Sequence, residues 1–100
     1  MSRCRAVERA EFHLSFVGDS VIGERANCEA GAMIANYRNE REDKRIRIRI
    51  GDVVVDTGVE KFGALVGDDA RIGANAAIAP GAVIHARTIV PRLSLVDQGA

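Results

Sequence analysis

The sequence predicts an all-β protein in which short strands follow one another around a coil, with one inserted β-hairpin. The main observation is a repeat of six residues. Branched aliphatic residues occupy every sixth position in the second half of the chain: Val66, Ile72, Ile78, Ile84, Val90 and Val96. A small residue lies four places beyond each of the first five: Ala70, Ala76, Ala82, Thr88 and Ser94.

A period of six indicates strands rather than helices. The apolar face of a helix recurs at three and four residues, whereas six is a multiple of the strand period of two. Glycine or asparagine stands where each short strand must bend, at Gly31, Asn75 and Gly81. These residue types tolerate positive φ angles, so we expect sharp corners there.

The same count runs through an earlier part of the chain. Its aliphatic positions are Phe16, Ile22, Cys28 and Ile34, and its small positions are Ser20, Ala26 and Ala32. We expect Cys28 to pack in the core as a small hydrophobe. The chain is therefore expected to form one domain over residues 1–100, with coils at about 10–35 and 64–96. Residues 1–9 fit the repeat poorly, and residues 97–100 are expected to fray.

An insertion at about 36–63 separates the two runs. A loop is followed by strict alternation of arginine and isoleucine over residues 45–50, then by Gly51-Asp52 and a second strand over residues 53–56. A two-residue link that begins with glycine suits a type II′ hairpin turn. The expected facing pairs are Ile50 with Val53, Ile48 with Val55, Ile46 with Thr57 and Arg47 with Asp56.

The hairpin has one apolar and one charged face in this register. An isolated hairpin is marginally stable in water, so we expect its Ile/Val face to pack on the coil or on an adjacent subunit. Arg45, Arg47 and Arg49 can either hold a phosphate or form a solvated strand face with one cross-strand ion pair. Charge runs usually serve solubility, which favours the solvated face.

The composition limits the partners. Lys+Arg and Asp+Glu both number 14, so there is no basic field to attract nucleic acid or an anionic membrane. The N-terminal stretch lacks a signal-peptide core, and no apolar run approaches a membrane span, so we expect a cytoplasmic protein. A chain of 100 residues leaves apolar surface that is hard to cover alone, which favours an oligomer.

Two sequence blocks carry a resemblance to a known family. HLSFVGDS at residues 13–20 and IANYR at residues 34–38 resemble the hexapeptide-repeat acyltransferases. They are most similar to the C-terminal domain of bifunctional sugar-1-phosphate nucleotidylyltransferase/glucosamine-1-phosphate N-acetyltransferases, and residues 56–68 resemble the archaeal branch. The resemblance implies a left-handed parallel β-helix with an inserted hairpin. It also implies a homotrimer that binds acetyl-CoA between neighbouring coils.

The resemblance also assigns roles to residues. It places His13 as the general base that takes a proton from the attacking amine, a task that imidazole suits near neutral pH. Amino-sugar phosphate is expected to contact Asn27, Asn36 and Tyr37. A family lysine is replaced here by Glu42, and Lys44 or Arg41 is expected to substitute for it in contacting the sugar phosphate. Ala30 and Ala74 are expected to contact the coenzyme, through the backbone in the case of Ala30.

Some residues depart from the family pattern. Phe16 stands where bacterial members usually carry tyrosine, and Arg3 and Arg5 are the only local candidates for the family's upstream phosphate-binding residues. No glycine-rich nucleotide loop is present, so we do not expect nucleotidylyl transfer from these residues alone.

Two functions of different kinds remain open. The first is an acetyl-CoA-dependent N-acetyltransferase acting on an amino sugar phosphate such as glucosamine-1-phosphate. The alternative is a non-catalytic trimerisation or regulatory β-helix that partners a separate nucleotidylyltransferase. A zinc-dependent carbonic anhydrase on a similar coil needs three histidine ligands, and the chain has only His13 and His85. We therefore expect no metal, and we expect His85 to point outward.

Overall fold

The computed structural model describes residues 4–6, 11–12 and 16–99, with side chains from Gly18 onward. The described residues form strands, turns and loops, and none of them forms a helix that could cross a membrane. The strands are β1 (Cys4–Ala6), β2 (Glu11–Phe12), β3 (Phe16–Val17), β4 (Ser20–Ile22), β5 (Asn27–Cys28), β6 (Met33–Ile34), β7 (Arg47–Ile50), β8 (Val53–Asp56), β9 (Leu65–Val66), β10 (Arg71–Ile72), β11 (Ala77–Ile78), β12 (Val83–Ile84), β13 (Ile89–Val90) and β14 (Leu95–Val96).

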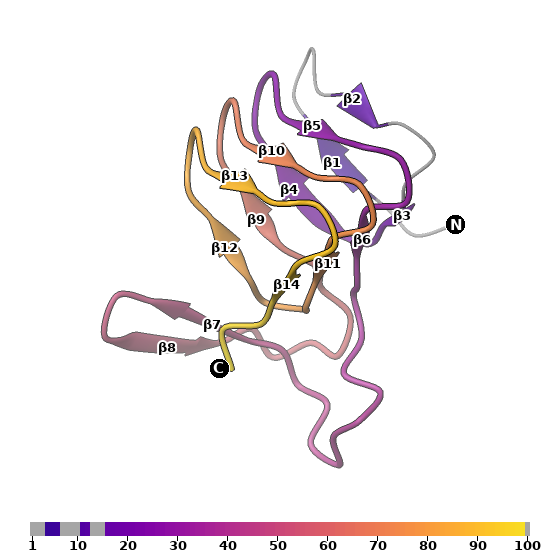
Figure 1. Cartoon of the computed structure of the whole chain (residues 1–100). Helices are drawn as coiled ribbons and strands as arrows, with labels where there is room; N and C mark the ends of the chain where they lie inside the picture. Colours follow the sequence, from indigo (N-terminus) through magenta and orange to yellow (C-terminus); the bar gives the residue numbers. More distant parts are fainter. Residues whose placement is uncertain (1–3, 7–10, 13–15, 100) are drawn as a thin grey trace.

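Twelve of these strands build three parallel sheets (Figure 1). The first sheet has the order β1-β4-β9-β12, the second β2-β5-β10-β13 and the third β3-β6-β11-β14. The chain visits the three sheets in turn and then begins the next round one strand further along each sheet. The expectation of an all-β protein with parallel strands is confirmed, and the topology is consistent with a β-helix.

The aliphatic positions of the repeat form the core. The second residue of each pair stacks on its equivalent in the next coil, as Ile72 does between Cys28 and Val90. The buried members are Ile22, Cys28, Ile34, Val66, Ile72, Ile78, Ile84 and Val90. The small residues at Ser20, Ala26, Ala32, Ala70, Ala76 and Ala82 are also buried. Only small side chains fit inside the corners, where the chain turns, which explains why these small positions of the repeat are buried.

The expected repeat was wrong by one residue at Phe16. In the third sheet Val17 pairs with Ile34, and Phe16 pairs with Met33. Only Gly18 and Asp19 separate β3 from β4, so the step from Val17 to Ile22 is five residues rather than six. Phe12 pairs with Cys28, so the step from Phe12 to Val17 is also five residues.

The predicted corners at Gly31, Asn75 and Gly81 are confirmed, with φ angles of 77°, 57° and 85°. Positive φ favours glycine and asparagine there, although Arg25, Asp69, Arg87 and Leu93 also adopt it at other corners. His85 lies in another corner and is exposed, as expected.

The predicted hairpin register is confirmed, because β7 and β8 pair Arg47 with Asp56 and Ile50 with Val53. The φ angle of Gly51 is 59° and that of Asp52 is not positive, as a type II′ turn requires. Ile46 and Ile48 are buried at the base of the hairpin.

The rest of the hairpin differs from the expectation in two ways. The apolar face is covered only at its base, and towards the turn Ile50 and Val53 are 56% and 61% exposed. The cross-strand ion pair comes from Arg45, whose Nη1 lies 3.2 Å from Asp56 Oδ2, while Arg47 bonds Asp43 at 2.7 Å. Arginine side chains are long enough to reach past the directly facing residue.

The two ends of the chain depart from the expectation. β1 lies before the expected start of the coil at about residue 10, and it pairs with β4 along all three of its residues. The expectation that residues 97–100 fray was wrong for Asp97 and Gln98. The Gln98 amide both donates to the Val83 carbonyl and accepts from the Val83 N–H, at 3.0 and 2.9 Å. Gln98 thereby occupies the edge of the first sheet as a further strand residue would.

Candidate functional site

The predicted site residues lie in three places. Asn27 is on β5, in the middle of the second sheet. Asn36 and Tyr37 follow β6, where the chain leaves the third sheet and enters the inserted loop. Ala30 and Ala74 lie in corners between the second and third sheets. His13 lies outside the described residues.

Ala30 and Ala74 occupy successive coils of the same corner. The Asn75 N–H donates to the Ala30 carbonyl at 3.2 Å, and the Leu93 N–H donates to the Ala74 carbonyl at 2.9 Å. The N–H of Ala74 donates to Glu29 Oε1 at 3.0 Å. These bonds stack the corners along the coil, and coenzyme contact by the two alanines stays a prediction.

Asn36 closes the corner between the third and first sheets. Its Nδ2 donates to Asp19 Oδ2 at 2.8 Å, and its carbonyl accepts the Phe62 N–H at 3.0 Å. A Cβ at Gly18 would lie 2.7 Å from the Asn36 side chain, so glycine permits this close approach. Asn36 therefore links the two ends of the insertion to the preceding corner.

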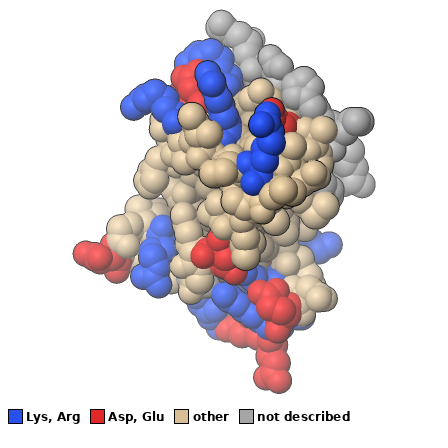
Figure 2. All heavy atoms as spheres, viewed as in Figure 1, with Lys and Arg blue, Asp and Glu red and all other residues tan. Residues whose placement is uncertain are grey.

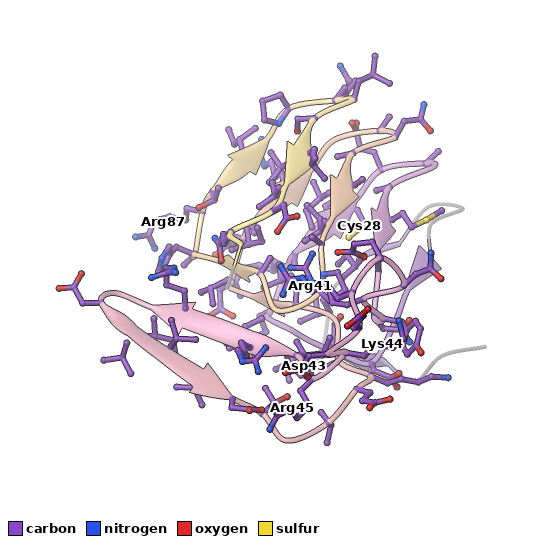
Figure 3. The ribbon with its side chains drawn as sticks, turned by 90° about the horizontal axis from the view of Figure 1, so that it is seen from below. Cys28, Arg41, Asp43, Lys44, Arg45 and Arg87 are labelled. Atoms are coloured by element: carbon purple, nitrogen blue, oxygen red, sulfur yellow. The ribbon has the colours of Figure 1, made fainter. Side chains whose placement is uncertain are left out.

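Tyr37 and Lys44 are brought together by the loop. The Lys44 ammonium lies 5.2 Å from the centre of the Tyr37 ring, within the range of a cation–π contact. It also donates to the carbonyls of Arg38, Asn39 and Arg41, at 3.3, 3.2 and 2.6 Å. An ammonium has three N–H donors, so these carbonyls use its full capacity. Lys44 lies within this loop beside Asp43 (Figure 3).

Arg38 closes the IANYR block and is a structural residue, a role that the sequence did not assign to it. It is buried, although it belongs to a loop rich in charged residues. Its guanidinium donates to the Pro80 carbonyl at 3.0 Å and to both carboxylate oxygens of Asp97. The guanidinium and the Gly99 N–H hold the pKa of the Asp97 carboxyl below its usual range. The IANYR block marks the position of Arg38, but nothing in it indicates a buried ion pair with Asp97.

A groove of about 770 Å³ crosses the outer face of the second sheet. Its lining comes from β5, β10 and β13 and from the corners beside them. The lining residues are Arg25, Asn27, Glu29, Arg71, Ile72, Gly73, Ile89, Val90, Pro91 and Arg92. Asn27 is the one predicted site residue among them. Arg71 and Ile89, the first residues of β10 and β13, are exposed beside it; the count of six relates these two to each other but cannot be carried across the insertion to Asn27.

Two ion pairs between coils flank the groove: the Arg25–Asp69 pair joins successive coils, and the Glu29–Arg92 pair spans the intervening coil that carries β10. Arg25 donates to both oxygens of Asp69 at 2.7 and 3.0 Å, and Arg92 donates to both oxygens of Glu29 at 3.0 Å. Arg25 holds the pKa of the Asp69 carboxyl below its usual range. In Figure 2, arginine or lysine side chains with carboxylates beside them lie over the upper part of the molecule. The pairs orient the corner side chains and leave the middle of the groove open.

Comparison with known proteins agrees with the resemblance found in the sequence. A bifunctional sugar-1-phosphate nucleotidylyltransferase/acetyltransferase of Sulfurisphaera tokodaii is 42% identical over 74 residues, which are 74% of this chain and 18% of that protein. The bifunctional protein GlmU of Methanococcus vannielii is 35% identical over 86 residues, or 86% of this chain and 20% of the relative. The chain is a homologue of these archaeal bifunctional proteins.

The chain also matches a third relative of the same kind. The bifunctional protein GlmU of Methanocaldococcus jannaschii is 33% identical over 86 residues, again 86% of this chain and 20% of the relative. No family model matches the chain. The chain spans about a fifth of the length of these relatives.

Proposed function

We propose that this chain forms a left-handed β-helix that transfers an acetyl group from acetyl-CoA to the amine of an amino sugar phosphate, such as glucosamine-1-phosphate. The observation that carries the proposal is the 42% identity, over 74 residues, to a relative whose name includes acetyltransferase. The stacked parallel coils supply a rigid support for a site at their edges.

The chemistry requires one proton acceptor and groups that position the acceptor amine. The amine nitrogen attacks the thioester carbonyl, a C–N bond forms, the C–S bond breaks and coenzyme A leaves as its thiolate. In this proposal His13 takes the proton that the amine loses. Asn27, Asn36 and Tyr37 supply amide and phenol hydrogen bonds to the sugar phosphate, and the backbone at Ala30 and Ala74 meets the coenzyme.

We place this site between the subunits of a homotrimer. Several outward-facing residues of the coil are large, apolar and exposed, and they occur on all three sheets or at their corners. These are Val21, Met33, Ile89, Leu93 and Leu95. A chain of 100 residues leaves apolar surface that it cannot cover alone, and in this proposal neighbouring subunits cover these residues.

One observation favours the alternative of a non-catalytic trimerisation or regulatory module that partners a separate nucleotidylyltransferase. The Lys44 ammonium is occupied by three loop carbonyls, and the Asn36 amide donates to Asp19. Two of the residues expected to hold substrate therefore already have partners within the chain.

The test is release of thiol from acetyl-CoA with glucosamine-1-phosphate as acceptor. It compares the unmodified chain with His13→Ala and with His85→Ala, which removes the other histidine at an exposed corner. We expect acceptor-dependent release that His13→Ala abolishes and His85→Ala preserves. If folded, assembled protein releases no thiol above the background without acceptor, acetyl transfer by this chain alone is wrong and the alternative stands.

A further inference from the structure

We propose that the groove over β5, β10 and β13 binds a phosphate monoester through Arg71, with the Asn27 side chain holding a hydroxyl or amine of the same ligand. The amino sugar phosphate of the proposed function is a ligand of this kind, and the inference rests on that function only for the ligand's identity. The site itself follows from the side chains that the coils bring together.

Arg71 is the cation in the groove that remains available. It stands at the centre of the outer face, paired in register with Asn27 on one side and Ile89 on the other. Arg25 and Arg92 are each engaged by a carboxylate in a two-bond ion pair. Among the described residues, the Arg71 side chain is exposed and forms no hydrogen bond or ion pair. A planar guanidinium can bind two oxygens of one phosphate.

Asn27 supplies the second element. Its Oδ1 is buried and has no hydrogen-bond partner among the residues that the structure describes. A buried acceptor without a donor is unfavourable, and in native structures such an atom calls for a functional explanation. The residue as a whole is only half-buried and lines the groove, so a ligand in the groove can approach its side chain. A ligand hydroxyl or amine would then satisfy it.

The spacing limits the ligand. Neighbouring parallel strands lie about 4.8 Å apart, so Asn27 and Arg71 suit an anion and a polar group on one small molecule. On the far side of Arg71, Ile89 is 68% exposed and Pro91 also lines the groove. The sheet thus presents an amide, a cation and an apolar surface in succession across three coils. A sugar phosphate offers hydroxyls, a phosphate and a C–H face to match them.

A phosphate monoester has two possible sources in the proposed reaction. One is the amino sugar phosphate, and the other is the 3′-phosphate of coenzyme A. Both present a dianionic group to a guanidinium, so separate binding measurements are needed to distinguish the two sources. Comparing the binding of glucosamine with that of glucosamine-1-phosphate tests the first source. Comparing the binding of dephospho-coenzyme A with that of coenzyme A tests the second.

The experiment is isothermal titration of the full chain at low ionic strength with each of these four compounds and no acetyl donor. It compares the unmodified chain with Arg71→Gln, Arg71→Lys and Asn27→Ala. The matched control is Arg49→Gln, which removes an exposed arginine on β7 outside the groove. Thermal melts establish that every variant is folded.

We expect Arg71→Gln to weaken binding of glucosamine-1-phosphate at least tenfold and to leave binding of glucosamine unchanged. Arg71→Lys should recover part of the loss, Asn27→Ala should weaken both sugars, and Arg49→Gln should bind normally. A loss confined to coenzyme A supports the phosphate site and identifies the coenzyme as its source.

The proposal is overturned if folded Arg71→Gln binds both phosphorylated compounds like the unmodified chain, or if Arg49→Gln weakens them equally. Because no acetyl donor is present, phosphate binding by a chain that fails to transfer acetyl groups would leave this site standing and count only against the proposed function.

Discussion

Arg38 from the inserted loop donates to both carboxylate oxygens of Asp97, which follows the last strand of the coil. Arg38 Nη2 lies 3.1 Å from Asp97 Oδ1, and Nη1 lies 3.3 Å from Oδ2. The arginine is buried, whereas the Asp97 side chain is 39% exposed. The same guanidinium bonds the Pro80 carbonyl at the intervening corner. One side chain thus fastens the insertion to the final coil.

Replacement of this arginine should destabilise the fold. Arg38→Ala leaves the Pro80 carbonyl without its donor, and we expect a loss of about 2 kcal/mol in the free energy of unfolding. The figure is below that for a fully buried pair because water screens the exposed side of Asp97. Urea denaturation measures it, with Arg49→Ala on the exposed hairpin face as the control. Equal stability of the two variants would contradict the role given to Arg38.

The same pair should make stability depend on acid pH. The pKa of Asp97 is lowered in the folded chain by Arg38, and that of Asp69 is lowered by Arg25. A lowered folded pKa stabilises the fold fully above the unfolded value of about 4, and the stabilisation is lost as the pH falls through the folded value. Melting temperatures should therefore fall below about pH 4.

The double variant Asp69→Asn/Asp97→Asn tests this origin. It should be less stable than the unmodified chain at neutral pH and should lose less stability on acidification. If its melting temperature falls with pH as steeply as that of the unmodified chain, other carboxylates cause the acid dependence.

Two glycines with positive φ should respond differently to alanine. Gly51 in the hairpin turn and Gly81 at the corner before β12 have φ angles of 59° and 85°. A Cβ at Gly51 meets open space, whereas a Cβ at Gly81 would collide with the Arg47 carbonyl oxygen. Gly51→Ala should cost about 1 kcal/mol from backbone strain.

Gly81→Ala should cost more than Gly51→Ala and should also displace the base of the hairpin. Hydrogen exchange of the β7 amides measures the displacement, and we expect faster exchange in Gly81→Ala alone. Unchanged β7 protection in that variant would mean that the hairpin does not rest on the Gly81 corner.

The third sheet offers a matched pair of core and surface truncations. Ile78 is 1% exposed on β11, and Leu95 on the neighbouring strand β14 is 70% exposed. Ile78→Ala should cost about 3 kcal/mol because it opens a cavity in a column of packed aliphatic side chains. Leu95→Ala should cost less than about 0.5 kcal/mol. Chemical denaturation of both variants checks the inward and outward assignment of the strand residues.

Local pattern predicted most of the coil because the environment of a strand residue depends on its place in the six-residue unit. This dependence predicts the core positions after residue 64, the small corner residues and the hairpin register. The failures have equally local causes. The two-residue corner at Gly18-Asp19 shortens one step of the repeat, so Val17 rather than Phe16 takes the core register. Gln98 replaces a missing strand partner with its side-chain amide, which no periodic pattern indicates.

The sequence by itself determined the repeat, the aliphatic column and the hairpin, because side-chain alternation and turn chemistry act over a few residues. Only the tertiary structure decided which distant residues meet. Arg25 and Asp69 lie 44 residues apart in the chain, and Asn27 meets Arg71 through the same stacking of coils. That stacking requires the chain to resume the coil after the insertion, and the count of six cannot be carried across a segment that does not obey it.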